Sequence, residues 1–305
     1  MMPYILFLLG LVLLIFGGDS MVRGAIPLAQ RLKVSALFIG VVLVGFGTST
    51  PELVASLFAV LGEQKAAGIA IGNVMGSNIA NVLLVLGCTA LLCPIKFPKA
   101  PFHRDALFLF LTIIGLDLVC YWGVLSRLTG LVFIALLAGY MGYTLATERQ
   151  DSLEAPTMSL WRSLLLAVGG IIGTLLGAKM MVNNAVIIAQ HWGVSDTVIG
   201  LTVIAIGTSL PELISSIMAG LHKNNSMVIG NIVGSNIYNA FFILGVVALV
   251  CPITVPGDMT ASAFVMTGTV LLFILSGYRK VISRPMGALF LVLYAAYLIS
   301  LGNPS

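Results

Sequence analysis

Long apolar stretches separated by short polar ones run along the whole chain. A helix needs about 20 mostly apolar residues to cross a bilayer, and ten stretches meet that need. The pattern therefore predicts ten membrane-spanning helices, at 4–22, 35–61, 66–92, 104–123, 128–147, 161–182, 195–220, 225–251, 260–278 and 285–301. The longest polar interval, residues 148–159 (ERQDSLEAPTMS), separates five helices from five. We expect an all-α polytopic membrane protein with the lipid bilayer as its solvent.

Composition supports this reading. Of the 305 residues, 59% are hydrophobic and 9% are charged, whereas soluble proteins carry about 25% charged residues. No basic stretch interleaved with aromatic residues suggests a nucleic-acid partner, and no obligate protein partner is evident. The spans contain no Ser–His, zinc-ligand or paired-aspartate constellation, so we expect neither an enzyme nor a resident cofactor.

The positive residues lie mostly on one face of the predicted bundle. Cytoplasmic loops carry the excess of Lys and Arg. Three of the 15 fall at one face: Lys65, Arg127 and Lys179. Twelve fall at the other: Arg23, Arg31, Lys33, Lys96, Lys99, Arg104, Arg149, Arg162, Lys223, Arg279, Lys280 and Arg284. We therefore expect a protein of the plasma or inner membrane with both termini outside and the 148–159 loop in the cytoplasm.

The two halves of the chain resemble each other. GFGTSTPEL (45–53) matches AIGTSLPEL (205–213), and GNVMGSNIANVLLVLG (72–87) matches GNIVGSNIYNAFFILG (230–245). Each half has five predicted spans, so the second half enters the membrane from the opposite side. This predicts two inverted-topology repeats, an architecture of many secondary transporters. The first repeat is 1–147, the linker 148–159 and the second repeat 160–305.

Two glutamates lie deep in apolar spans at equivalent repeat positions. An ionisable residue at that depth is costly unless it is paired or faces a polar cavity, so Glu52 and Glu212 are candidate functional residues. Pro51 and Pro211 precede them, and proline removes a helical hydrogen bond to the carbonyl four residues earlier. The carbonyls that lose this partner are those of Gly47 and Gly207. We expect each helix to break there, near the middle of the membrane.

Neutral oxygen donors accompany both glutamates. Carboxylate, hydroxyl, carboxamide and carbonyl oxygens favour Ca²⁺, Na⁺, Mg²⁺ or Mn²⁺ over zinc or copper. The same hydroxyls and amides could instead join helices to one another. Asp117, near the external end of the fourth span, has no repeat counterpart, and we expect it to have an interfacial or helix-pairing role rather than a role in transport. The donors that accompany the glutamates are Thr48, Ser49, Ser77 and Asn81 in the first half and Thr208, Ser209, Ser235 and Asn239 in the second.

The blocks GTSTPE/GTSLPE and GSNIAN/GSNIYN resemble the paired repeats of the sodium/calcium exchanger family, within the cation/Ca²⁺ antiporter superfamily. The resemblance covers essentially the whole chain. It implies antiport of Ca²⁺ against Na⁺, with three Na⁺ per Ca²⁺, at a site shared by the second, third, seventh and eighth spans. It implies as ligands the two glutamates, the eight donors above and the backbone carbonyls near Gly45 and Ala205.

Some alternatives remain open at this stage. Several members of the superfamily carry aspartate where this chain has Asn239, which removes one titratable group and leaves the coupling ion undecided. Antiport of H⁺ against Ca²⁺ through the same glutamates is the closest alternative, and a passive cation channel is a second. The 148–159 linker is too short to hold the calcium-sensing domain of animal exchangers.

Overall fold

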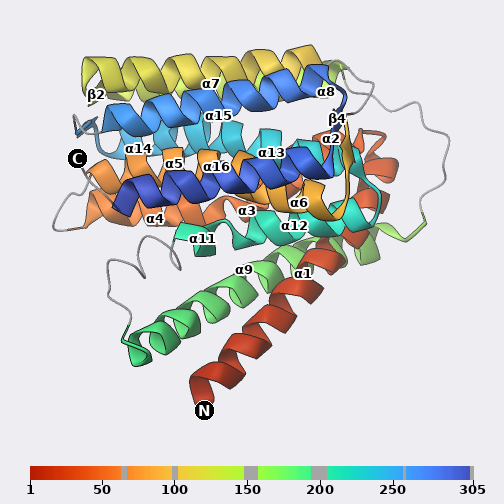
Figure 1. The fold of residues 1–305 in the computed structure, drawn as a ribbon. Coiled ribbons are helices and arrows are strands. Elements are labelled where there is room, and N and C mark those ends of the chain that lie inside the picture. Colours follow the sequence, from red (N-terminus) through yellow and green to blue (C-terminus); the bar gives the residue numbers. More distant parts are fainter. Residues whose placement is uncertain (63–66, 98–101, 148–156, 194–204, 257–258, 303–305) are drawn as a thin grey trace.

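The structure is a computed structural model that describes all residues except 63–66, 98–101, 148–156, 194–204, 257–258 and 303–305. It is a bundle of helices, some of them interrupted by π-helical segments, which are labelled η (Figure 1). The helices of the first half are α1 (Met2–Leu32), α2 (Ala36–Ile39), η1 (Gly40–Gly45), α3 (Phe46–Thr48), α4 (Thr50–Leu61), α5 (Ala67–Ala80), η2 (Asn81–Leu86), α6 (Gly87–Leu92), α7 (Phe102–Trp122) and α8 (Arg127–Thr147). Those of the second half are α9 (Leu160–His191), α11 (Ala205–Thr208), α12 (Leu210–Leu221), α13 (Asn225–Ile237), η4 (Tyr238–Ile243), α14 (Leu244–Val250), α15 (Met259–Tyr278) and α16 (Arg284–Gly302).

The described residues confirm a polytopic helical membrane protein. Eight helices are long and apolar enough to cross a bilayer, and the bent pair Ala36–Thr48 and Thr50–Leu61 forms a ninth candidate span. The predicted span 195–220 is represented by α11 and α12, but its first ten residues, 195–204, lie outside the described part of the chain. The count of ten therefore stays a prediction.

The two longest helices, α1 and α9, cross each other closely and in antiparallel directions. A Cβ atom on Gly17 would lie 2.4 Å from the backbone nitrogen of Thr174, and one on Gly170 would lie 2.3 Å from that of Met21. Only glycine permits the two backbones to approach so closely. Membrane helices commonly pack against each other through small residues in this way. Both helices run further than the predicted spans 4–22 and 161–182, because a helix can continue past the end of its apolar stretch.

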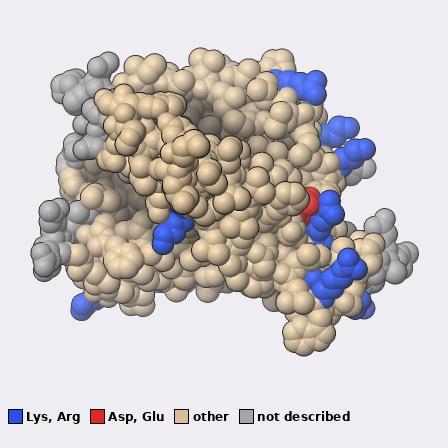
Figure 2. All heavy atoms as spheres, turned by 90° about the horizontal axis from the view of Figure 1, so that it is seen from below, with Lys and Arg blue, Asp and Glu red and all other residues tan. Residues whose placement is uncertain are grey.

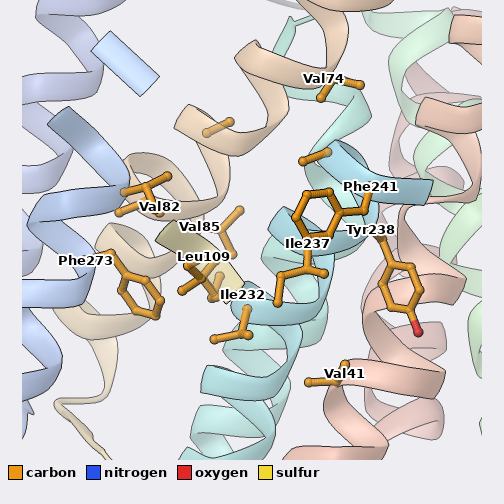
Figure 3. Packing of buried hydrophobic residues seen from close by; sticks show 14 of the residues in the cluster. Val41, Val74, Val82, Val85, Leu109, Ile232, Ile237, Tyr238, Phe241 and Phe273 are labelled. Atoms are coloured by element: carbon orange, nitrogen blue, oxygen red, sulfur yellow. The ribbon is translucent and has the colours of Figure 1, made fainter. Parts of the chain in front are cut away.

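The centre of the bundle is formed by the equivalent helices of the two repeats. Buried residues make up 78% of the most apolar part of Gly68–Leu92 and 83% of that of Asn225–Val250, more than in any of the other six unbroken candidate helices. Figure 3 shows part of the surrounding cluster, in which Val82 and Val85 of η2 lie near Leu109 of α7 and Phe273 of α15. The two spans that carry Ser77, Asn81, Ser235 and Asn239 are therefore the most deeply buried of the eight unbroken candidate helices.

Two short antiparallel strand pairs join the repeats at opposite ends of the bundle. β1 (Ile95–Lys96) pairs with β4 (Val281–Ile282), and β2 (Val124–Leu125) pairs with β3 (Ile253–Thr254). Each pair takes one strand from each half of the chain, and Figure 1 shows β2 and β4 at opposite ends. The all-α prediction missed these strands, because two residues are too few for an alternating pattern to be visible.

Most of the basic residues visible in Figure 2 lie toward one end of the molecule, and a few lie away from it. The guanidinium of Arg31 donates to the carbonyl of Met158 at 2.9 and 2.6 Å, and that of Arg284 donates to the carbonyl of Leu92 at 3.4 Å. These contacts bring the end of α1 next to the start of α9 and the start of α16 next to the end of α6.

Candidate cation-binding site

Both predicted helix breaks are present and have the same backbone conformation. Ser49, between α3 and α4, has φ −82° and ψ 6°, and Ser209, between α11 and α12, has φ −88° and ψ 3°. Pro51 and Pro211 lie in the first turn of the helices that follow, where proline fits because those N–H groups have no helical partner. The bend between the two parts of the second span is 41°.

The two breaks meet, and each carries a buried carboxyl group. Glu52 and Glu212 are each 1% exposed and lie in the first turns of α4 and α12. The hydroxyl of Ser49 donates to Oε1 of Glu212 at 3.2 Å. The first repeat therefore contributes directly to the surroundings of the glutamate of the second.

The carbonyl of Gly45, an implied ligand, already accepts hydrogen bonds next to the first break. The Thr48 hydroxyl donates to the carbonyls of Val44 at 2.9 Å and Gly45 at 3.3 Å, and the Ser49 N–H donates to Gly45 at 3.1 Å. The Gly45 carbonyl thus accepts two bonds in this structure. Ala205 is the first residue of α11 and borders the segment that the structure does not describe.

Four further predicted residues lie where α5 and α13 pass into π-helical segments. Ser77 and Ser235 lie on α5 and α13, and Asn81 and Asn239 lie in η2 and η4. All four are buried. Short π-helical segments inside α-helices occur frequently at functional sites, because the wider turn changes the direction of the side chains and carbonyls.

Unpartnered polar atoms concentrate on these residues. Within the part of the chain that the structure describes, ten side-chain oxygen or nitrogen atoms are buried without a hydrogen-bond partner. Seven of them belong to predicted ligands: Oε2 of Glu52 and of Glu212, both amide atoms of Asn81, the hydroxyls of Ser209 and Ser235, and Oδ1 of Asn239. The other three belong to Gln30, Asn231 and Asn236. Each unpaired buried atom costs about 1–3 kcal/mol, so oxygens in such numbers fit a cation-binding site.

Two asparagines that the sequence analysis did not single out hold the glutamates in place. Asn73 Nδ2 donates to the backbone carbonyl of Glu52 at 3.1 Å and to the hydroxyl four residues further along α4 at 3.0 Å. Asn231 makes the equivalent bonds around Glu212, at 3.2 and 2.9 Å. Their shared position in the matched blocks GNVMGSN and GNIVGSN was the available signal.

Asp117, a further carboxylate within a candidate span, hydrogen bonds to another helix. The Thr267 hydroxyl donates to Asp117 at 3.0 and 3.2 Å and so joins α15 to α7. The structure thus agrees with a helix-pairing role for Asp117. Across the described ranges, no group of three or more His, Cys, Asp or Glu residues could hold a metal ion. Any cation in the cluster would therefore combine two carboxylates with neutral oxygens.

A cavity of about 480 Å³ reaches both breaks from the side of α9. Pro51 and Pro211 lie on its wall, together with Gly207 and Thr208 of α11. Lys179 and Asn183 of α9 are polar residues of its opposite side. The cavity therefore lies directly beside the helix breaks at Ser49 and Ser209.

Two broken helices that meet near the middle of the molecule, each with a buried carboxyl group and hydroxyls at the break, are typical of a membrane transporter. The chain belongs to the sodium/calcium exchanger family, whose profile, described as sodium/calcium exchanger protein, matches residues 2–146 and 162–302. CaxA of Alkalimonas amylolytica is 37% identical over 308 residues, which cover 95% of each chain. The sodium/calcium exchanger MaX1 of Methanosarcina acetivorans is 32% identical over 350 residues, which cover 98% of each chain.

A solved structure shows the same fold. The sodium-calcium exchanger NCX_Mj, soaked with 2.5 mM Na⁺ and 0.1 mM Ca²⁺, matches with a TM-score of 0.86 at 33% identity. The match covers 100% of this chain and 99% of that one. The resemblance inferred from the motifs is confirmed, and exchange of Ca²⁺ for another cation is the activity of the family.

Proposed function

We propose that the protein is a secondary-active antiporter that exchanges three Na⁺ for one Ca²⁺. Transport occurs by alternating access at a site formed by both breaks together with Ser77, Asn81, Ser235 and Asn239. The observation that carries this proposal is that seven of the ten unpartnered buried polar atoms among the described residues belong to predicted ligands of both repeats, including one oxygen of each glutamate. Hard oxygen donors of this kind suit both ions. The protein moves ions without catalysing a chemical reaction and needs no resident cofactor.

The charge of the site determines what each cycle moves. With Glu52 and Glu212 ionised and all other ligands neutral, the empty site has a charge of −2. One Ca²⁺ brings the site to zero, whereas three Na⁺ bring it to +1. The two loaded states differ by one charge, so each cycle carries one net charge across the bilayer.

The proposed architecture is two inverted repeats of five spans each, 1–147 and 160–305, with both termini outside and 148–159 in the cytoplasm of the cell. Three observations support it. The strand pairs join the repeats at opposite ends of the bundle. Most of the basic residues visible in Figure 2 lie toward one end. The family profile matches two separate stretches of the chain.

Uptake of ⁴⁵Ca²⁺ into proteoliposomes tests the proposal. A Na⁺ gradient at equal pH on both sides is expected to drive Ca²⁺ accumulation, and a pH gradient without Na⁺ is not. Accumulation driven by the pH gradient alone would establish the H⁺/Ca²⁺ alternative. Conductance of Ca²⁺ without counter-transport would establish a channel.

Voltage tests the stoichiometry. Moving one charge through 100 mV is worth about 2.3 kcal/mol, which corresponds to about a 50-fold change in the equilibrium Ca²⁺ ratio. The potential is set with K⁺ and valinomycin at a fixed Na⁺ gradient, and Ca²⁺ is measured at equilibrium. An equilibrium Ca²⁺ ratio that does not change with the membrane potential would exclude three Na⁺ per Ca²⁺. It would not contradict the site formed by the two glutamates.

A further inference from the structure

Two asparagines at the same repeat position make different hydrogen bonds. Asn78 and Asn236 are the asparagines of the matched GSN triplets, and both are fully buried. Asn236 Nδ2 donates to the carbonyl of Ile232 in its own helix, at 2.7 Å. Asn78 Nδ2 instead crosses to the other repeat and donates to the backbone carbonyl of Asn236 at 3.3 Å, while Asn78 Oδ1 accepts from Asn239 Nδ2 at 3.1 Å. The matched triplets therefore do not give matched contacts.

The chain of bonds through Asn78 determines the orientation of Asn239. A backbone carbonyl can only accept, so the amide nitrogen of Asn78 must face it. The Oδ1 of Asn78 then faces Asn239 and requires a donor there. Asn239 must therefore turn its nitrogen toward Asn78, which leaves its oxygen as the atom for another partner. That oxygen is buried and has no partner among the described residues.

The equivalent residue of the first repeat is not held in this way. Both amide atoms of Asn81 are buried and unpartnered within the described structure. Its carboxamide can rotate to offer either its oxygen to a cation or its nitrogen to a carboxylate. Two asparagines at matching positions thus form one ligand of fixed orientation and one of adjustable orientation.

We propose that Asn78 is a positioning residue for ion exchange, which fixes Asn239 with its Oδ1 toward the transported cation while Asn81 adapts to the ion that is bound. This inference rests on the proposed transport function. An oxygen held in its binding orientation needs no reorientation when the ion arrives, and such preorganisation strengthens binding. The site then has one carboxamide ligand of fixed orientation, Asn239, and one of adjustable orientation, Asn81. This arrangement can serve two ions of different charge, Ca²⁺ and Na⁺.

The test compares Asn78→Ala with Asn236→Ala in the ⁴⁵Ca²⁺ uptake assay. Removing the side chain of Asn78 leaves Asn239 without the hydrogen bond that orients it. We expect the Ca²⁺ concentration for half-maximal uptake to rise about 10-fold, because about one hydrogen bond is lost. The maximal rate is expected to stay within about 2-fold, because the glutamates are unchanged. Asn236→Ala keeps the backbone carbonyl that Asn78 needs and is the matched control, expected to shift the half-maximal concentration by less than about 2-fold.

A double-mutant cycle separates positioning from a purely structural role. If Asn78 acts through Asn239, then Asn78→Ala has no further effect on half-maximal Ca²⁺ in an Asn239→Ala background. If Asn78→Ala does not yield folded protein, Asn78→Ser, whose side chain is too short to contact both partners, takes its place with the same expectation.

Each possible failure has a distinct meaning. A wild-type protein without Na⁺-driven uptake refutes the proposed function, and the inference with it. Active wild type with an unchanged Asn78 variant refutes the inference alone. So does an Asn236→Ala effect as large as that of Asn78→Ala, or an Asn78→Ala effect that persists without the Asn239 side chain.

Discussion

Replacing Glu212 with glutamine removes one charge from the site and little else. The side chain is 1% exposed and accepts a hydrogen bond from Ser49 at 3.2 Å. Glutamine has nearly the same shape, and its Oε1 can accept the same bond. The effect of Glu212→Gln on binding should therefore scale with the charge of the ion.

The expected magnitude follows from the electrostatics of two buried charges. Two unit charges 4 Å apart interact by about 4 kcal/mol at an effective dielectric constant of about 20, and a divalent ion doubles this to about 8 kcal/mol. We take about half as the net loss, because the amide oxygen still attracts the ion and a neutral group is easier to bury. Ca²⁺ binding should then weaken by about 4 kcal/mol, or about 1000-fold, and Na⁺ binding by about 2 kcal/mol, or about 30-fold.

Binding calorimetry on purified protein in detergent measures both affinities, and ⁴⁵Ca²⁺ uptake measures the consequence. The matched control is Asp117→Asn, which neutralises another intramembrane carboxylate that bonds to Thr267 outside the cluster; it should leave both affinities unchanged. Equal weakening for Ca²⁺ and Na⁺, or Ca²⁺ affinity within about 10-fold of wild type, would refute charge attraction as the source of binding.

Further predictions concern the same site, the helix crossing and the orientation. Glu52→Gln should abolish Ca²⁺ transport while the protein stays folded, as judged by gel filtration, and uptake near the wild-type rate would remove Glu52 from the ligands. Asn73→Ala and Asn231→Ala should each lower the free energy of unfolding by a similar amount, about 1–3 kcal/mol, and very unequal losses would contradict their equivalence. Gly170→Val should lower the Tm sharply because a Cβ there meets Met21, whereas Gly169→Val, with no atom of the described residues within 4 Å, should not. A cysteine at position 152 in an otherwise cysteine-free protein should resist impermeant reagents added to intact cells, and labelling from outside would reverse the proposed orientation.

Local chemistry could be predicted from the sequence, whereas contacts between the repeats could not. The breaks at Ser49 and Ser209 follow from the missing N–H of a proline two residues later, a property of a few neighbouring residues. The approach of Ser49 to Glu212 depends on how two distant helices pack, and no repeat alignment contains that information. The hydrogen bonds of Asn78 and Asn236 differ from what the alignment predicts, because alignment alone treats the two residues as equivalent.

The strand pair β1·β4 has a consequence for biogenesis. Ile95 pairs with Ile282, so the ribosome must synthesise nearly the whole chain before this strand pair can form. Asn78 depends on the second half in the same way, because its carboxamide lacks its partners Asn236 and Asn239 until that half is made. A chain terminated in the first half would leave this buried carboxamide without its partners in the membrane. Two halves synthesised as separate polypeptides should nevertheless find each other, because every contact that completes them is noncovalent.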